Sequence, residues 1–185
     1  SFNLPQGVAL GEATETVQRL TNEIGMPPQI RASFAGNAKA FTDSIPKVYE
    51  QNLVPLIFEP YAADIVTRLR ARPVARLLEI AAGTGVVTRA LAAGLPDGTA
   101  IVATDLNQAM LDQAAKAGTS RAVDWKQADA MQLPFPDASF DAVVCQFGVM
   151  FFPDKPRALA EARRVLKPGG TFIYNVWDRI GENEF

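Results

Sequence analysis

The spacing of apolar residues along the chain changes near residue 76. Before this point, residues 12–24 and 37–71 carry apolar side chains at helical spacing. After it, the predicted strands lie near residues 76–81, 99–105, 123–128, 140–147 and 171–177, and the predicted helices lie over residues 85–94, 107–117 and 155–166. Strands that alternate with helices in this way indicate an α/β fold with a parallel sheet.

Residues at the predicted helix ends match this division. Asn107 and Asp154 are suited to cap the second and third of these helices. Lys167-Pro168-Gly169-Gly170 is expected to stop the last helix and turn the chain into the fifth strand. Arg72-Pro73 closes the helical first part. We therefore predict an N-terminal helical segment over residues 1–72 and an α/β segment over residues 73–185.

Composition narrows the classes of protein. The 185 residues are 48% apolar and 21% charged, which favours one globular unit, and the single cysteine together with no visible signal peptide favours a cytoplasmic setting. Lys and Arg total 18 against 20 Asp and Glu, so no electrostatic footprint for nucleic acid is expected. The longest nearly apolar run, residues 142–152, is shorter than the roughly 20 residues of a membrane span. One cysteine, Cys145, and no histidine exclude an internal disulfide, a Cys or His zinc cluster and an imidazole base, so no metal is expected.

A glycine turn after the first predicted strand is the main chemical signal. Gly83 and Gly85 lie in this turn, and Asp105 follows the second strand about 20 residues later. In an open parallel sheet this pattern holds a nucleoside, with the acid accepting the ribose hydroxyls. Two purely structural roles stay open, because turn glycines often serve only to pack a helix on a strand, and Asp105 can act as a helix cap.

The turn does not fit a dinucleotide well. Neither register of the glycines completes Gly-x-Gly-x-x-Gly. A Glu79 carboxylate about 5 Å from a phosphate would cost roughly 3 kcal/mol at an effective dielectric near 20. The same carboxylate favours a ligand ammonium group. A nucleotide-dependent oxidoreductase using NAD or NADP therefore remains the less favoured alternative.

Several further segments carry a resemblance when they are taken together. They are Leu78-Glu79-Ile80-Ala81-Ala82-Gly83-Thr84-Gly85, Asp105-Leu106-Asn107 with Met110, Ala128-Asp129-Ala130, Leu133-Pro134-Phe135, Phe140-Asp141-Ala142-Val143-Val144 and Arg164-Val165-Leu166-Lys167-Pro168-Gly169-Gly170. Over residues 76–177 the chain resembles the class I S-adenosylmethionine-dependent methyltransferases, in particular the group that includes the ubiquinone and menaquinone C-methyltransferases. The resemblance implies a Rossmann-like, doubly wound sheet of strand order 3-2-1-4-5 with an N-terminal helical lid.

The resemblance implies a cofactor, S-adenosylmethionine, and its product S-adenosylhomocysteine. Glu79, Ala81, Gly83 and the Gly85 turn would surround the methionine moiety, and Asp105 would hold the ribose. Gln146, at the end of the fourth strand, would present its carbonyl to the amino group. Ala81 stands where the family often has glycine, which narrows the turn.

The same resemblance implies an adenine site. Leu106 and Met110 would lie against the ring, although Met110 fits plain core packing equally well. Asp129 would accept from the exocyclic amine, with the backbone of Ala130 at the ring. Tyr49 resembles an aromatic residue of the family's lid, and core packing accounts for it equally well.

The implied reaction is methyl transfer by in-line displacement to a small, apolar or ring-containing metabolite. Aromatic and methionine side chains available for such an acceptor are Phe41, Tyr49, Phe58, Tyr61, Phe147, Met150, Phe151 and Phe152, and we assign the contacts to Phe147, Met150 and Phe151. Ordinary core packing also accounts for most of these rings. No residue is identified as a catalytic base. A non-catalytic donor-binding protein or regulatory subunit is the alternative.

The end of the chain departs from the pattern of the family that it resembles. The chain ends just after the fifth predicted strand, where the family's fold normally continues with a final helix and an antiparallel pair formed by the sixth and seventh strands. This would leave an apolar edge strand uncovered. We therefore expect either a fragment or a partner subunit on this edge, with a homodimer as one such arrangement.

Overall fold

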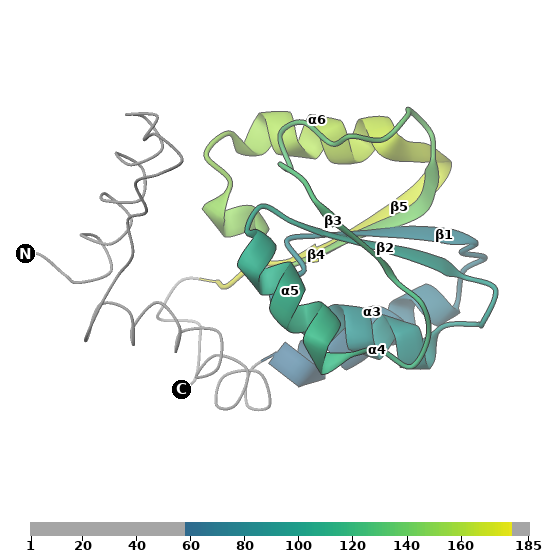
Figure 1. The fold of residues 1–185 in the computed structure, drawn as a ribbon. Coiled ribbons are helices and arrows are strands. Elements are labelled where there is room, and N and C mark those ends of the chain that lie inside the picture. Colours follow the sequence, from purple (N-terminus) through teal and green to yellow (C-terminus); the bar gives the residue numbers. More distant parts are fainter. Residues whose placement is uncertain (1–57, 179–185) are drawn as a thin grey trace, which may run out of the picture. The chain divides into compact units, whose positions relative to one another are not determined.

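The computed structural model describes residues 58–178 (Figure 1). The chain divides into two compact units, Ser1–Gln51 and Asn52–Phe185, and every described residue belongs to the second unit. No helix within residues 58–178 has the length and apolar character that crossing a membrane requires. The division of function between residues 1–72 and 73–185 stays a prediction.

A parallel sheet of five strands organises the described unit, in the order β3-β2-β1-β4-β5 (Figure 1). The strands are β1 Arg76–Ile80, β2 Ala100–Asp105, β3 Asp124–Gln127, β4 Phe140–Gln146 and β5 Leu166–Asn175. The strand order of the predicted Rossmann-like sheet is therefore confirmed. The order reverses between β1 and β4, and in such folds ligands bind beyond the carboxyl ends of the strands near that point.

Helices connect and cover the strands. They are α3 Glu59–Arg70, α4 Val86–Gly94, α5 Gln108–Ala117 and α6 Lys155–Val165, with a short 3-10 turn, η2, at Val149–Phe151. Both predicted caps are confirmed. The Asn107 side chain accepts from the Ala109 amide, and Asp154 accepts from the Arg157 amide.

Apolar side chains form a core on each face of the sheet. On one face, α3 and α4 pack on strand residues such as Leu77, Ile101 and Val144. Helix α6 covers the opposite face (Figure 1). It packs there on Leu78 and Val143. Each fully buried Leu, Val or Ile side chain contributes roughly 1.5–3 kcal/mol relative to exposure. Both faces of the central strands are thus apolar, and a polar side chain that lies among them needs a hydrogen-bond partner.

The prediction for the start of the last strand was wrong. Strand β5 begins at Leu166, directly after α6, and Lys167–Gly170 lies within it. Phe140 pairs with Leu166, and the next aligned pair is Ala142 with Thr171, so β5 has three more residues than β4 between these pairs. Residues 167–170, which were predicted to form a turn before the strand, therefore form a bulge inside it. The reason is that Leu166 already pairs with β4, whereas the predicted strand began at residue 171.

Candidate functional site

The turn between β1 and α4 lies at the carboxyl end of the central strand. Ala81, Gly83 and Gly85 all have positive φ, at 55°, 56° and 81°. The Gly85 amide donates to the Ala82 carbonyl at 2.9 Å, and the Ala82 amide donates to the Thr104 carbonyl of β2, also at 2.9 Å. These bonds hold the turn against the end of the neighbouring strand.

The two glycines of the turn serve different purposes. A Cβ atom at Gly85 would lie 3.0 Å from Ala114 Cβ and 3.1 Å from Trp125 Cη2, so this glycine permits close packing against α5 and β3. A Cβ atom at Gly83 would meet no atom of the described residues within 4 Å. The backbone at Gly83 therefore faces open space, which a ligand needs in order to approach it.

Ala81 occupies its strained conformation beside a glycine from another strand end. A Cβ atom at Gly148 would lie 2.6 Å from Ala81 Cβ and 2.8 Å from Cys145 Sγ. Alanine at the turn is therefore accommodated by the lack of a side chain at residue 148. This contact joins the turn after β1 to the segment after β4.

Asp105, the last residue of β2, is tied to the turn by its carboxylate. Oδ2 accepts from the Gly83 amide at 2.8 Å, and Oδ1 accepts from the Asn107 amide at 2.8 Å. Asn107, rather than Asp105, caps α5. Each carboxylate oxygen has a further lone pair, so Asp105 retains the capacity to accept two hydroxyl hydrogen bonds.

Glu79 is a buried carboxyl inside an apolar layer. Its side chain is 2% exposed, and Oε2 accepts a 2.6 Å hydrogen bond from the Thr88 hydroxyl of α4. Burial raises the pKa of Glu79 to about 8; the Thr88 hydrogen bond opposes this rise, the charge of Asp105 adds to it and that of Arg89 opposes it. The sequence identified Glu79 but not Thr88, whose only signal is its place on the first turns of the following helix.

Gln146 ends β4 with an unsatisfied acceptor. Its Nε2 donates to the Phe58 carbonyl at 3.1 Å. Its Oε1 is buried and has no hydrogen-bond partner among the described residues. Buried acceptors nearly always accept a hydrogen bond, so we expect this oxygen to pair with a donor that the described residues do not supply.

The residues predicted for adenine come from two segments of the chain, one between β2 and β3 and one just after β3. Leu106 is 68% exposed just after β2, and Met110 is half-buried on the first turn of α5. Asp129 accepts from the Met131 amide through Oδ1, and Ala130 is buried in the core on the α6 side. Their contacts with a ligand stay predictions. Tyr49 and Phe41 lie outside the described residues.

The predicted acceptor residues differ in their surroundings. The Phe147 ring stacks on Trp177 with centroids 4.1 Å apart and packs edge-on against Phe58 and Tyr61. Phe151, in η2, is 80% exposed, whereas Met150 beside it is half-buried. Sequence reasoning missed Trp177, because nothing local indicates that it meets Phe147.

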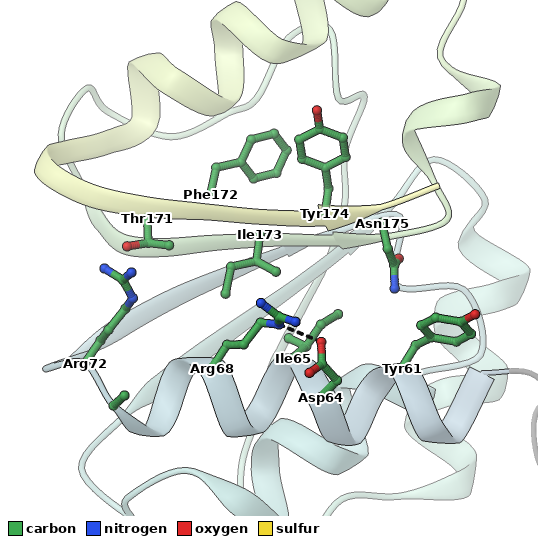
Figure 2. Close-up of a pocket in the computed structure, with 11 residues that line it drawn as sticks. Tyr61, Asp64, Ile65, Arg68, Arg72, Thr171, Phe172, Ile173, Tyr174 and Asn175 are labelled. Carbon is green, nitrogen blue, oxygen red and sulfur yellow. Dashed lines mark hydrogen bonds and ion pairs between the residues drawn. The ribbon is translucent and has the colours of Figure 1, made fainter. Parts of the chain in front are cut away.

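A groove of about 780 Å³ runs between α3 and the outer edge of β5 (Figure 2). Tyr61, Arg68 and Arg72 line it from the helix side, and Thr171–Asn175 lines it from the strand. The close-up shows the ion pair between Arg68 and Asp64, whose nitrogen and oxygen lie 2.6 Å apart. None of Glu79, Asp105 and Gln146 lines this groove.

Comparisons with known proteins match the same part of the chain. A family model described as a methyltransferase domain matches residues 78–174. A ubiquinone/menaquinone biosynthesis C-methyltransferase from Bordetella avium is 34% identical over 176 residues, which cover 82% of this chain and 67% of that protein. A demethylmenaquinone methyltransferase from Clavibacter sepedonicus is 37% identical over 143 residues, which cover 75% of this chain and 57% of that protein.

A solved structure agrees with these matches. The crystal structure of an S-adenosylmethionine-dependent methyltransferase from Thermotoga maritima superposes with a TM-score of 0.55 at 28% identity. The superposition covers 73% of this chain and 57% of that chain. The chain thus spans between 57% and 67% of the length of these three proteins.

Proposed function

Because the chain belongs to the S-adenosylmethionine-dependent methyltransferase family, we propose that it transfers a methyl group from this cofactor to a small, apolar or ring-containing acceptor. The family membership supports the cofactor. The acceptor is inferred from the aromatic and apolar side chains near the end of β4, including Phe147, Met150 and Phe151.

The unsatisfied Gln146 oxygen is the observation that carries the proposal. This buried carbonyl oxygen has no donor within the described part of the chain, and the ammonium group of an amino acid, which has three hydrogens to donate and no lone pair, would match it. A phosphate, which offers acceptor oxygens, does not satisfy it. The residues present therefore fit S-adenosylmethionine better than a dinucleotide.

Three parts of the site take separate roles in this proposal. Asp105 accepts the ribose hydroxyls through lone pairs that its backbone bonds leave unused. Gly83 allows the ligand to approach the turn. Glu79 contributes negative potential behind the turn when it is ionised. Leu106 and Met110 cover the adenine, and Asp129 and Ala130 meet its edge.

The chemistry asks the chain mainly to bind and orient two molecules. S-adenosylmethionine, when bound, supplies a methyl carbon on a positively charged sulfur that leaves readily. Holding a nucleophile in line with that carbon contributes on the order of 7–11 kcal/mol through proximity and orientation. The chain has no histidine, so an imidazole base is excluded. We therefore assign catalysis to positioning and to exclusion of water.

The names of the relatives direct the first choice of acceptor. One relative is named as a ubiquinone/menaquinone biosynthesis C-methyltransferase and the other as a demethylmenaquinone methyltransferase. A ring carbon of a quinone precursor is therefore the first acceptor to test. Because the chain spans only part of these proteins, this acceptor is part of the proposal.

Two measurements test the proposed function. Calorimetry with S-adenosylmethionine, S-adenosylhomocysteine and NAD should show saturable binding of the first two and none of NAD. Methyl transfer from isotopically labelled donor to a panel of metabolites, quinone precursors included, should then yield a labelled product. Binding of NAD alone contradicts the cofactor assignment. Binding of the donor without transfer to any metabolite favours a donor-binding or regulatory protein.

A further inference from the structure

The surroundings of Glu79 disfavour a charged carboxylate in the ligand-free protein. The side chain is 2% exposed between apolar strand residues, and among residues 58–178 it receives a single hydrogen bond, from Thr88. Within residues 58–178 it forms no ion pair. A buried carboxylate needs several hydrogen bonds or an opposite charge to stay ionised.

Within the described part of the chain, the titratable groups that interact with Glu79 come from three elements. Arg89 of α4 favours the charged form, but its Nη1 donates to the Thr84 carbonyl at 2.8 Å. Asp105 at the end of β2 disfavours the charged form. Cys145 of β4 is buried, and burial together with the charges of Glu79 and Asp105 raises its pKa to about 12, so its thiol stays neutral. The balance favours the protonated form of Glu79 near neutral pH.

A bound cation changes this balance. Glu79 lies one residue before the end of β1, directly behind the turn, and its neighbour Val144 in β4 lies two residues before Gln146. Side chains alternate along a strand, so Glu79, Val144 and Gln146 are on the same face of the sheet. A ligand ammonium that satisfies Gln146 Oε1 therefore introduces positive charge on the face that holds Glu79.

We propose that Glu79 is the proton-exchanging group of the donor site: it is uncharged in the ligand-free protein and releases its proton to solvent when a ligand with a charged amino-acid group binds. This inference rests on the proposed function. The exchange balances, because one proton leaves the carboxyl as one ligand cation arrives. The site then holds a carboxylate and a cation on the same face of the sheet, whereas the free protein avoids burying an unpaired charge.

The number of protons released on binding follows from the pKa of Glu79 in the ligand-free protein. A carboxyl with a pKa of about 8 is roughly nine-tenths protonated at pH 7. Binding should therefore release up to about 0.9 proton per ligand at pH 7. The amino group of the ligand, with an ordinary pKa near 8, takes up about 0.1 proton under the same conditions in every variant. Affinity should rise as pH increases toward 8.

Calorimetry in buffers of different ionisation enthalpy measures the released protons. We would titrate wild-type protein, Glu79→Gln and the control Asp112→Asn with S-adenosylmethionine, S-adenosylhomocysteine and 5′-methylthioadenosine. Asp112 is an exposed carboxyl on α5, so its amide variant controls for loss of a charge. Wild type and Asp112→Asn should show a net release of about 0.5–0.8 proton with the first two ligands, once the uptake by the ligand amino group is included. Glu79→Gln should release none with any ligand, and 5′-methylthioadenosine, which lacks the amino acid, should release none from any protein.

The outcomes separate this inference from the function on which it rests. Binding of S-adenosylmethionine by wild type with less than about 0.2 proton released overturns the inference alone. Equal release from Glu79→Gln and wild type does the same. If neither S-adenosylmethionine nor S-adenosylhomocysteine binds, the inference and the proposed function both fail.

A second variant tests the inference without removing the carboxyl. Thr88→Val deletes the one hydrogen bond that favours the ionised form, so the midpoint of the pH dependence of affinity should move upward by part of a pH unit. Far-ultraviolet circular dichroism checks that each variant is folded. A midpoint that does not move, or that moves downward, overturns the assignment to Glu79.

Discussion

The backbone amide of Gly83 donates a 2.8 Å hydrogen bond to Oδ2 of Asp105. This bond links the turn after β1 to the last residue of β2, across 22 residues of sequence. It fixes both the carboxylate and the turn before any ligand binds. Preorganisation of this kind lowers the ordering cost of binding.

Asp105→Asn tests the ribose role. The amide keeps one acceptor oxygen but loses the charge and one acceptor, so we expect the affinity for S-adenosylmethionine to fall by about 1–3 kcal/mol. Calorimetry measures the change, and Asp112→Asn serves as the control for an exposed carboxyl on α5. An affinity equal to that of wild type would remove the ribose assignment.

Gln146→Leu tests the unsatisfied acceptor. The variant removes Oε1 while it keeps a side chain of similar size, so binding of S-adenosylmethionine and S-adenosylhomocysteine should weaken by about 1–2 kcal/mol, a 5- to 30-fold change. The variant also loses the Nε2 bond to the Phe58 carbonyl. 5′-Methylthioadenosine, which has no ammonium group, therefore provides the comparison, and equal weakening of all three ligands would argue for a structural role.

Gly148→Ala tests the contact with Ala81. Gly148 has ordinary φ and ψ of −80° and −35°, so alanine fits the backbone, but its Cβ would lie 2.6 Å from Ala81 Cβ. We expect the free energy of unfolding to fall by about 1–3 kcal/mol in denaturant titrations. Adding Ala81→Gly should recover part of the loss, although Cys145 Sγ remains close at 2.8 Å. Strictly additive effects would show that the two residues are not coupled.

Phe151→Ala tests the acceptor region. Phe151 is 80% exposed, so the substitution should change the free energy of unfolding by less than about 0.5 kcal/mol. With an active acceptor, the KM for that acceptor should rise while the affinity for S-adenosylmethionine stays constant. Steady-state kinetics and calorimetry give the two numbers. An unchanged acceptor KM would remove Phe151 from the acceptor site.

Arg164→Gln tests the hydrogen-bond network beneath α6. Arg164 donates to the Leu133 and Phe135 carbonyls and to the Glu161 and Asp137 carboxylates, so its loss should reduce the free energy of unfolding by about 1–3 kcal/mol at pH 7. Arg164 lowers the pKa of Glu161 below its ordinary value of 4.5. A lowered pKa gives stability above about pH 4.5 that is lost as pH falls through the folded-state value.

The difference in the free energy of unfolding between wild type and Arg164→Gln should therefore shrink below about pH 4.5. Denaturant titrations between pH 3 and pH 7 follow this difference directly. Arg163→Gln, in the same last turn of α6, is the matched control. A difference that stays constant with pH would show that Glu161 does not contribute through its charge.

Much of the fold follows from local patterns. Apolar periodicity predicts the alternation of strands and helices, and the caps at Asn107 and Asp154 depend on residues two or three positions away. The position of Asp105 at the carboxyl edge of the sheet follows from its place at the end of a parallel strand. The bulge at Lys167–Gly170 was not predictable in this way, because pairing with β4 decides where β5 begins.

The sequence by itself thus determined the order of the elements, the strand ends that carry Glu79, Asp105 and Gln146, and the family whose motifs these residues form. Only the tertiary structure decided the burial and the hydrogen bonding of these side chains. Burial in the core raises the pKa of Glu79 to about 8 against the opposing hydrogen bond from Thr88, and Gln146 Oε1 has no hydrogen-bond partner among the described residues, although residues distant in sequence close around it. Periodicity and capping arise from neighbours in the chain, whereas burial and hydrogen-bond pairing depend on residues that only the fold brings together.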